Sequence, residues 1–124
     1  MSQPNYTAEQ IDSIQFDLAQ QLRTARRRSA ELMEKTAKAK SITDLPSQHF
    51  LDMADFTDRT AALEHFNNRL TEAGADAAAI QKVLKSTRRN CLGEVLYADP
   101  ARTNQHRMRA AQVIVGIFAD AETL

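Results

Sequence analysis

Glycine, proline and cysteine are scarce in this sequence. The 124 residues include three glycines, three prolines and one cysteine, and there is no tryptophan. The single cysteine, Cys91, cannot close a disulfide within the chain, which suits a reducing compartment, so we expect a cytoplasmic location. With so few glycines and prolines, long stretches contain no residue that stops a helix. The scarcity excludes a disulfide-stabilised scaffold and favours long helices.

Long apolar runs are also absent. The longest one extends from Ala110 to Ala121 and is interrupted by Gln112 and Asp120. A membrane-spanning helix needs about 20 consecutive apolar residues. The first residues lack the basic and apolar regions of a secretory signal. We therefore expect no membrane span and no signal peptide.

A net charge is missing as well, although the charges are ordered along the chain. The 16 basic residues balance the 16 acidic ones, so no overall field draws the protein to nucleic acid or to an anionic membrane. Residues 18–40 hold seven basic and two acidic side chains, residues 41–81 hold two and seven, and residues 82–109 hold seven and two. In an antiparallel bundle the acidic stretch would lie beside the basic ones. The blocks predict ion pairs between neighbouring helices, each contributing less than about 1 kcal/mol to stability. Repulsion between like-charged helices would oppose other helix pairings.

Residues that favour helix dominate, and no window alternates like a strand. Thr7 and Gln10 form a capping box, which predicts that a helix starts at Ala8. Apolar residues then recur every three or four positions as far as Thr36, and the helix is expected over 8–40. At 1.5 Å per residue it would be roughly 50 Å long, against a diameter of about 35 Å for a compact domain of this size. We therefore expect the first helix to overhang.

A second helical stretch is expected from Pro46, with Asp44 or Ser47 as its cap, to Gly74. The residues around Thr57 leave open whether this stretch is one helix or two.

Two further helices complete the chain. Asp76 caps the third, and the pair Asp99-Pro100 places a cap and a first-turn proline before the fourth, which runs to about Ala121. The sequence thus predicts an all-α, antiparallel bundle of about four helices with a long N-terminal helix. We expect a single domain over 1–124 with a flexible N-terminus over 1–7.

The fourth helix is apolar on nearly every side. Val113, Ile114, Ile117 and Phe118 point almost all the way round the helix axis. Such a helix is either central in the bundle or covered by a second subunit, and Gly116 would admit another backbone. Because a four-helix monomer rarely has a central helix, we predict a homodimer or a complex with another helical protein.

The first helix carries a second face opposite its apolar stripe, formed by Phe16, Gln20, Arg23 and Arg27. Phenylalanine and arginine are frequent interface anchors, although an isolated exposed phenylalanine beside solvated arginines accounts for the same residues. The predicted function is a non-catalytic helical interaction or regulatory module. Its predicted partner-binding residues are Phe16, Arg23, Arg27, Val113, Ile114, Ile117 and Phe118.

An alternative function is DNA binding, because residues 66–89 resemble a helix-turn-helix motif with Gly74 in the turn. In that interpretation Gln81, Lys82 and Lys85 face the bases, and Arg88 and Arg89 contact phosphates. Against it, the helix opens with three alanines over 77–79, where base reading normally begins, and Leu70 stands where a small residue is usual. A plain helical hairpin accounts for the same residues.

The sequence predicts no catalytic residue, metal site or cofactor. The three histidines, at positions 49, 65 and 106, show no metal-ligand spacing, and there is no glycine-rich phosphate loop or nucleophile motif. Cys91 would be activated if Arg88 and Arg89 surrounded it, and otherwise it is a small packing residue. A third possible function is an amphipathic coat on granule surfaces. The stretch 38–45 with Phe50 and Phe56 is loosely similar to granule-coating phasins, a low-complexity match that ends before Gly74.

Overall fold

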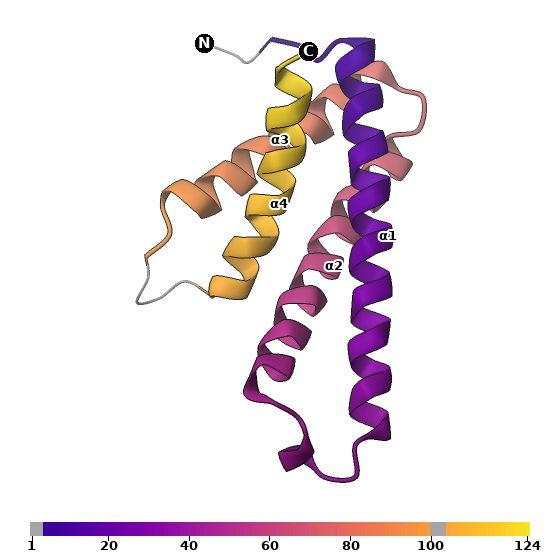
Figure 1. Cartoon of the computed structure of the whole chain (residues 1–124). Helices are drawn as coiled ribbons and strands as arrows, with labels where there is room; N and C mark the ends of the chain where they lie inside the picture. Colours follow the sequence, from indigo (N-terminus) through magenta and orange to yellow (C-terminus); the bar gives the residue numbers. More distant parts are fainter. Residues whose placement is uncertain (1–3, 100–103) are drawn as a thin grey trace.

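The protein is a four-helix, all-α structure, as the sequence predicted (Figure 1). The computed structural model describes residues 4–99 and 104–124, and these ranges contain no strand. The helices are α1 (Ala8–Lys38), α2 (Ser47–Ala73), α3 (Ala77–Leu96) and α4 (Gln105–Glu122), with a short 3-10 turn, η1 (Ile42–Asp44), between the first two.

Local residues set the start of α1 and the end of α2. The Thr7 hydroxyl accepts the Gln10 amide N–H and the Gln10 side chain accepts the Thr7 amide N–H, which is the predicted capping box. The second stretch is one unbroken helix. The expectation that Asp44 or Ser47 caps it is wrong, because Pro46 is the cap residue and no described side chain accepts a hydrogen bond from the first amide groups. Gly74 ends it with a φ of 59°, a backbone conformation that disfavours residues with a Cβ.

Asp76 caps α3 as predicted, since its carboxylate accepts hydrogen bonds from the amide N–H groups of Ala78 and Ala79.

The predicted start of the fourth helix at Asp99-Pro100 is wrong. The helix begins at Gln105, because the Asn104 side chain caps the amide groups of His106 and Arg107. Pro100 itself lies outside the described residues.

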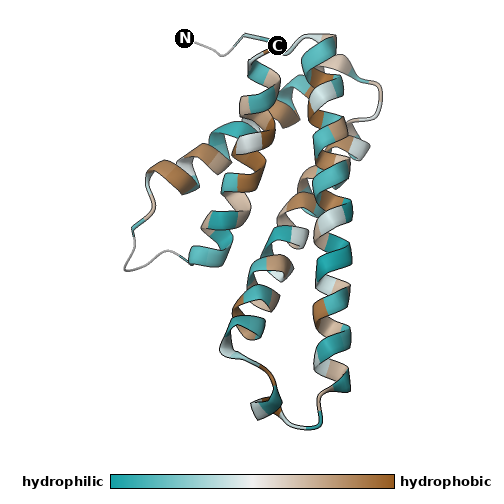
Figure 2. Ribbon diagram, in the orientation of Figure 1, coloured by the Kyte–Doolittle hydropathy of each residue, from teal (hydrophilic) through white to brown (hydrophobic). Residues whose placement is uncertain are grey.

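The core lies where α4 packs against α1, α2 and α3 (Figure 1). The Phe66 and Phe118 rings stack with centroids 5.6 Å apart. In Figure 2, hydrophobic residues recur along α4, whereas most of α1 is hydrophilic. The helix residues of the core cluster are Ile14, Leu18, Leu22, Ala25, Leu63, Phe66, Leu70, Leu84, Ile114, Ile117, Phe118 and Ala121.

The α1–α2 hairpin extends beyond α3 and α4, as the length of α1 led us to expect (Figure 1). Its far part is two helices thick, and α2 covers the inner side of α1 there. Leu32 is buried, and the Thr36 hydroxyl lies 2.7 Å from Nε2 of the buried His49. The overhang of α1 is therefore shared with α2.

The acidic second helix lies between basic partners, as the charge blocks predicted. Arg26 Nε of α1 lies 3.1 Å from Glu64 Oε1 of α2, and Arg109 Nη1 of α4 lies 2.9 Å from Asp55 Oδ2 of α2. Because the Arg26–Glu64 pair is largely exposed, it contributes at most about 1 kcal/mol. The pairs favour this arrangement of helices over its alternatives.

Residues 4–6, part of the N-terminus that we expected to be flexible over 1–7, are anchored before α1, and residues 1–3 lie outside the described ranges. Tyr6 is buried against Phe118, and its backbone N–H donates to Gln81 Oε1 of α3 over 2.8 Å. The Gln81 amide in turn donates to the Tyr6 carbonyl oxygen, also over 2.8 Å. An aromatic side chain that fills the end of the core holds residues 4–6 in place.

Candidate functional site

The predicted partner-binding residues of α4 lie inside the chain. Ile114, Ile117 and Phe118 are buried in the core, and Val113 is half-buried and packs against it. The helix is central, since α1, α2 and α3 all pack against it. This chain therefore covers the apolar sides of α4 itself, and they no longer require a second subunit.

The predicted residues of α1 lie on the surface. Phe16 is 63% exposed, and Arg23 and Arg27 are exposed on the same side. Within the described residues neither arginine forms an ion pair, whereas the nearby Arg26 and Arg28 bind carboxylates. We call the outward stripe of Asp12, Phe16, Ala19, Gln20, Arg23 and Arg27 the outer face of α1; all six residues are exposed.

The residues predicted to contact DNA are largely engaged within the chain. Gln81 binds the Tyr6 backbone, Lys85 Nζ lies 2.6 Å from Asn5 Oδ1, and Arg88 Nε lies 2.6 Å from Glu122 Oε1. Lys82 and Arg89 are exposed. Gln81, one of the three residues expected to face the bases, thus holds the N-terminal segment instead.

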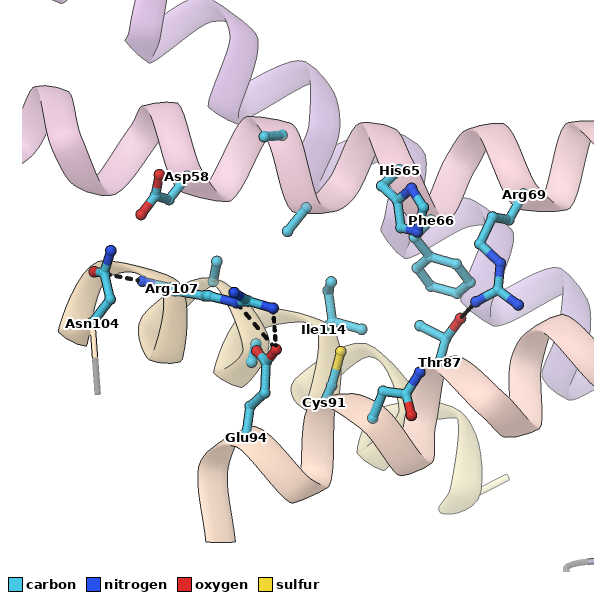
Figure 3. A pocket seen from close by; sticks show the side chains of 15 residues that line it. Asp58, His65, Phe66, Arg69, Thr87, Cys91, Glu94, Asn104, Arg107 and Ile114 are labelled. Carbon is cyan, nitrogen blue, oxygen red and sulfur yellow. Dashed lines mark hydrogen bonds and ion pairs between the residues drawn. The ribbon is translucent and has the colours of Figure 1, made fainter. Parts of the chain in front are cut away.

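A cleft of about 600 Å³ lies between α2 and α3, and α4 forms its floor (Figure 3). The floor is apolar, with Phe66 of α2 and with Ala110, Ala111 and Ile114 of α4. The small alanines of α4 and the pair Ala61 and Ala62 of α2 leave this space open. Two Ala-Ala pairs were the signal in the sequence that could have indicated it.

The rim of the cleft is polar and is partly held by its own contacts (Figure 3). At one end Arg107 Nη2 lies 3.0 Å from Glu94 Oε1. At the other end the Arg69 guanidinium donates to the hydroxyls of Ser86 and Thr87. The cleft therefore offers an apolar floor between two fixed polar ends.

Cys91 points its sulfur into this cleft toward Ile114 (Figure 3). Burial, and then the negative charge of Glu94, raises the pKa of the Cys91 thiol to about 11. Arg88 pairs with Glu122 and Arg89 is exposed. The thiol is therefore neutral near pH 7, which fits a packing residue and not a nucleophile.

A charged cluster that sequence reasoning missed joins α2 to the first turns of α4. The Asp55 carboxylate binds His106 Nδ1 and accepts two hydrogen bonds from Arg109 Nη1, at 3.2 and 2.9 Å. Burial by itself would raise the pKa of Asp55, but these hydrogen bonds and the charges of Arg109 and His106 lower it below its usual value. The partners lie more than fifty residues apart in sequence, so no local pattern could reveal them.

The described residues show neither a metal-binding cluster nor a membrane-spanning helix. Over 4–99 and 104–124, no group of three or more histidine, cysteine, aspartate or glutamate side chains is placed to hold a metal ion. No helix in the same ranges is long and apolar enough to cross a membrane. His49 lies in the α1–α2 hairpin, His65 on the cleft rim and His106 in the charged cluster, so the three histidines do not meet.

Comparisons with known proteins found no matching family model, no similar curated protein and no similar solved structure.

Proposed function

We propose that this protein is a non-catalytic helical interaction module that binds a protein partner through the outer face of α1. The observation that carries the proposal is Phe16, which is 63% exposed within the N-terminal third of α1, while Phe66 and Phe118 are each 1% exposed. An exposed phenylalanine flanked by arginines has the composition of an interface centre.

The state of the charges on this face supports the proposal. Arg26 and Arg28 of the same helix bind Glu64, Glu31 and Asp52, whereas Arg23 and Arg27 have no carboxylate partner within the described residues. An arginine fork binds a partner carboxylate through two hydrogen bonds and also stacks on aromatic rings. Two such groups beside one phenylalanine offer both kinds of contact.

The state of Cys91 and of the two polar ends of the cleft also favours binding over catalysis. Its thiol is neutral, and its polar ends are occupied by the Arg107–Glu94 and Arg69–Thr87 contacts. The cleft is an apolar recess that fits an apolar side chain or a small molecule. We treat it as a secondary surface, because the Arg107–Glu94 pair and the Arg69 hydrogen bonds occupy its two ends.

Photocrosslinking in the cells that make the protein tests the proposal. A benzophenone amino acid at position 16 should give discrete protein adducts of defined mass. The same amino acid at position 119, an exposed alanine of α4, is the matched control and should give none. Equal labelling at both positions, or no adduct at position 16, would overturn the proposal.

A further inference from the structure

The outer face of α1 is complementary to itself, and its order along the helix is the basis of the inference. Asp12, Phe16, Ala19, Gln20, Arg23 and Arg27 fall within about 100° around the axis at 3.6 residues per turn. The acidic residue stands at one end, the arginines stand at the other, and the aromatic ring lies between them. The buried residues of α1, such as Leu18 and Leu22, lie on the opposite side.

We propose that two copies of this chain associate through antiparallel pairing of their α1 outer faces, about a two-fold axis between Ala19 and Gln20. This axis places Asp12 opposite Arg27 of the second copy and Phe16 opposite Arg23 of the second copy. The midpoint of positions 12 and 27 and the midpoint of positions 16 and 23 both fall between Ala19 and Gln20, so a single register of the two helices forms both contacts. The two-fold symmetry then forms each contact twice, as an isologous interface requires.

The chemistry of the two contacts is favourable. Asp12 and Arg27 are exposed, and neither forms an ion pair within the described residues, so no internal contact must break. Arg23 over the Phe16 ring is a cation–π contact, a kind that gains strength as water is excluded. Ala19 and Gln20 lie nearest to the axis, and Ala19 is small enough to let the helices approach.

The other orientation is unfavourable. In a parallel pair without stagger, each residue of the face would lie near its own copy, so Arg23 and Arg27 would face arginines and Asp12 would face aspartate. Like charges placed opposite each other destabilise an interface. The charge order of the face therefore selects the antiparallel pair.

The dimer should be weak and should depend on concentration. A single helix pair buries less surface than the roughly 1,200–2,000 Å² of a standard stable interface. Light scattering on the full chain should show the mass rising from 13.9 kDa toward twice that value over the micromolar to submillimolar range. A mass of one chain at several hundred micromolar would overturn the inference.

Charge exchange tests the register. Asp12→Arg alone places an arginine opposite Arg27 of the second copy, and Arg27→Asp alone places an aspartate opposite Asp12. Because like charges repel, each single variant should weaken association at least tenfold. The double variant Asp12→Arg/Arg27→Asp should restore it. The control Asp12→Arg/Arg23→Asp has the same composition but the wrong register and should not be restored. Equal recovery in both double variants, or recovery in neither, would overturn the proposed pairing.

The aromatic contact has its own control. Phe16→Ala should weaken association at least tenfold, whereas Met33→Ala, at an equally exposed position of α1 that lies off the outer face, should leave it unchanged. Circular dichroism of each variant should show unchanged helix content, because every substituted side chain is exposed. Equal weakening by both substitutions would contradict the role of Phe16.

This inference rests on the proposed function but fails separately from it. Adducts at position 16 that contain only a different protein, together with a monomeric mass, would uphold the interaction module and reject the self-pairing. Absence of any adduct would reject both.

Discussion

Asp55 shows how one carboxylate can connect two helices. Its oxygens accept hydrogen bonds from Arg109 and bind His106, so a residue in the first half of α2 fixes the first turns of α4. Hydrogen bonds to a charged group contribute about 1.5–3 kcal/mol when they are sheltered from water. The Asp55 side chain is 14% exposed, which places it in the sheltered class.

Asp55→Asn should therefore lower the free energy of unfolding by about 1–3 kcal/mol near pH 7. Because the folded-state pKa of Asp55 is lowered, the stabilisation is complete above its ordinary pKa of 3.8 and is lost as the pH falls through the folded value. The difference in free energy of unfolding between the natural chain and the variant should therefore shrink as the pH falls below 3.8. Urea unfolding at a series of pH values measures it, and a difference that stays constant into strong acid would contradict the account.

Cys91 should react slowly with alkylating reagents in the folded protein. Burial and Glu94 raise the pKa of its thiol to about 11, so little thiolate is present near pH 7. Iodoacetamide labelling followed by mass spectrometry should be at least about tenfold slower in the native chain than in the chain unfolded in urea. Equal rates in the two states would show that the cleft does not shelter the sulfur.

At the scale of the element, the start of α1, the end of α2 and the start of α3 could be read from the sequence. Thr7 with Gln10, Gly74 and Asp76 act within one or two turns of their own position, and local chemistry of this kind needs no knowledge of the fold. The start of α4 was misjudged because both Asp99 and Asn104 are good caps. Their local preferences are alike, and the choice between them depends on where the helix packs.

Gly74 and Gly116 make a matched pair for testing the role of glycine. Gly74 has a φ of 59°, so Gly74→Ala should destabilise the protein by about 1–3 kcal/mol through backbone strain. Gly116 lies within α4, and no neighbouring atom lies within 4 Å of an added Cβ, so Gly116→Ala should stabilise by about 0.5–1 kcal/mol. Thermal unfolding of both variants tests this, and a shift of the same sign in both would contradict it.

At the scale of the whole molecule, the fold class was predictable, while the features made by distant residues were not. The periodicity of α1 predicted the helical class, and the charge blocks predicted that α2 lies beside basic helices. The central position of α4, the cleft over Ala110 and Ala111, and the anchoring of Tyr6 all depend on contacts between residues far apart in the chain. Of the candidate site, the sequence predicted Phe16, Arg23 and Arg27 but not Asp12, whose proposed role requires a second copy of the chain.

The two-helix part of the α1–α2 hairpin should open more readily than the four-helix core. Residues 29–38 and 47–54 belong to the part of the hairpin that extends beyond α3 and α4, whereas residues 14–25 and 63–70 contribute to the core that includes α4 (Figure 1). Regions with fewer buried contacts unfold locally at lower free-energy cost. Amide hydrogen exchange followed by mass spectrometry should show faster exchange in the first pair of segments. Uniform protection along α1 would contradict the two-part description.

The contact between Tyr6 and Glu122 has a consequence for connectivity. The Tyr6 hydroxyl donates to Glu122 Oε1 over 3.2 Å, so the two ends of the described chain meet beside the core. The η1 turn lies at the opposite end of the hairpin, and its residues contribute nothing to the core. A circular permutant that joins residue 124 to residue 4 through a short linker and opens within 42–44 should therefore keep all four helices in place. Circular dichroism and thermal unfolding of the permutant should match those of the natural chain, and a loss of helix content would show that the packing of the helices depends on their order in the chain.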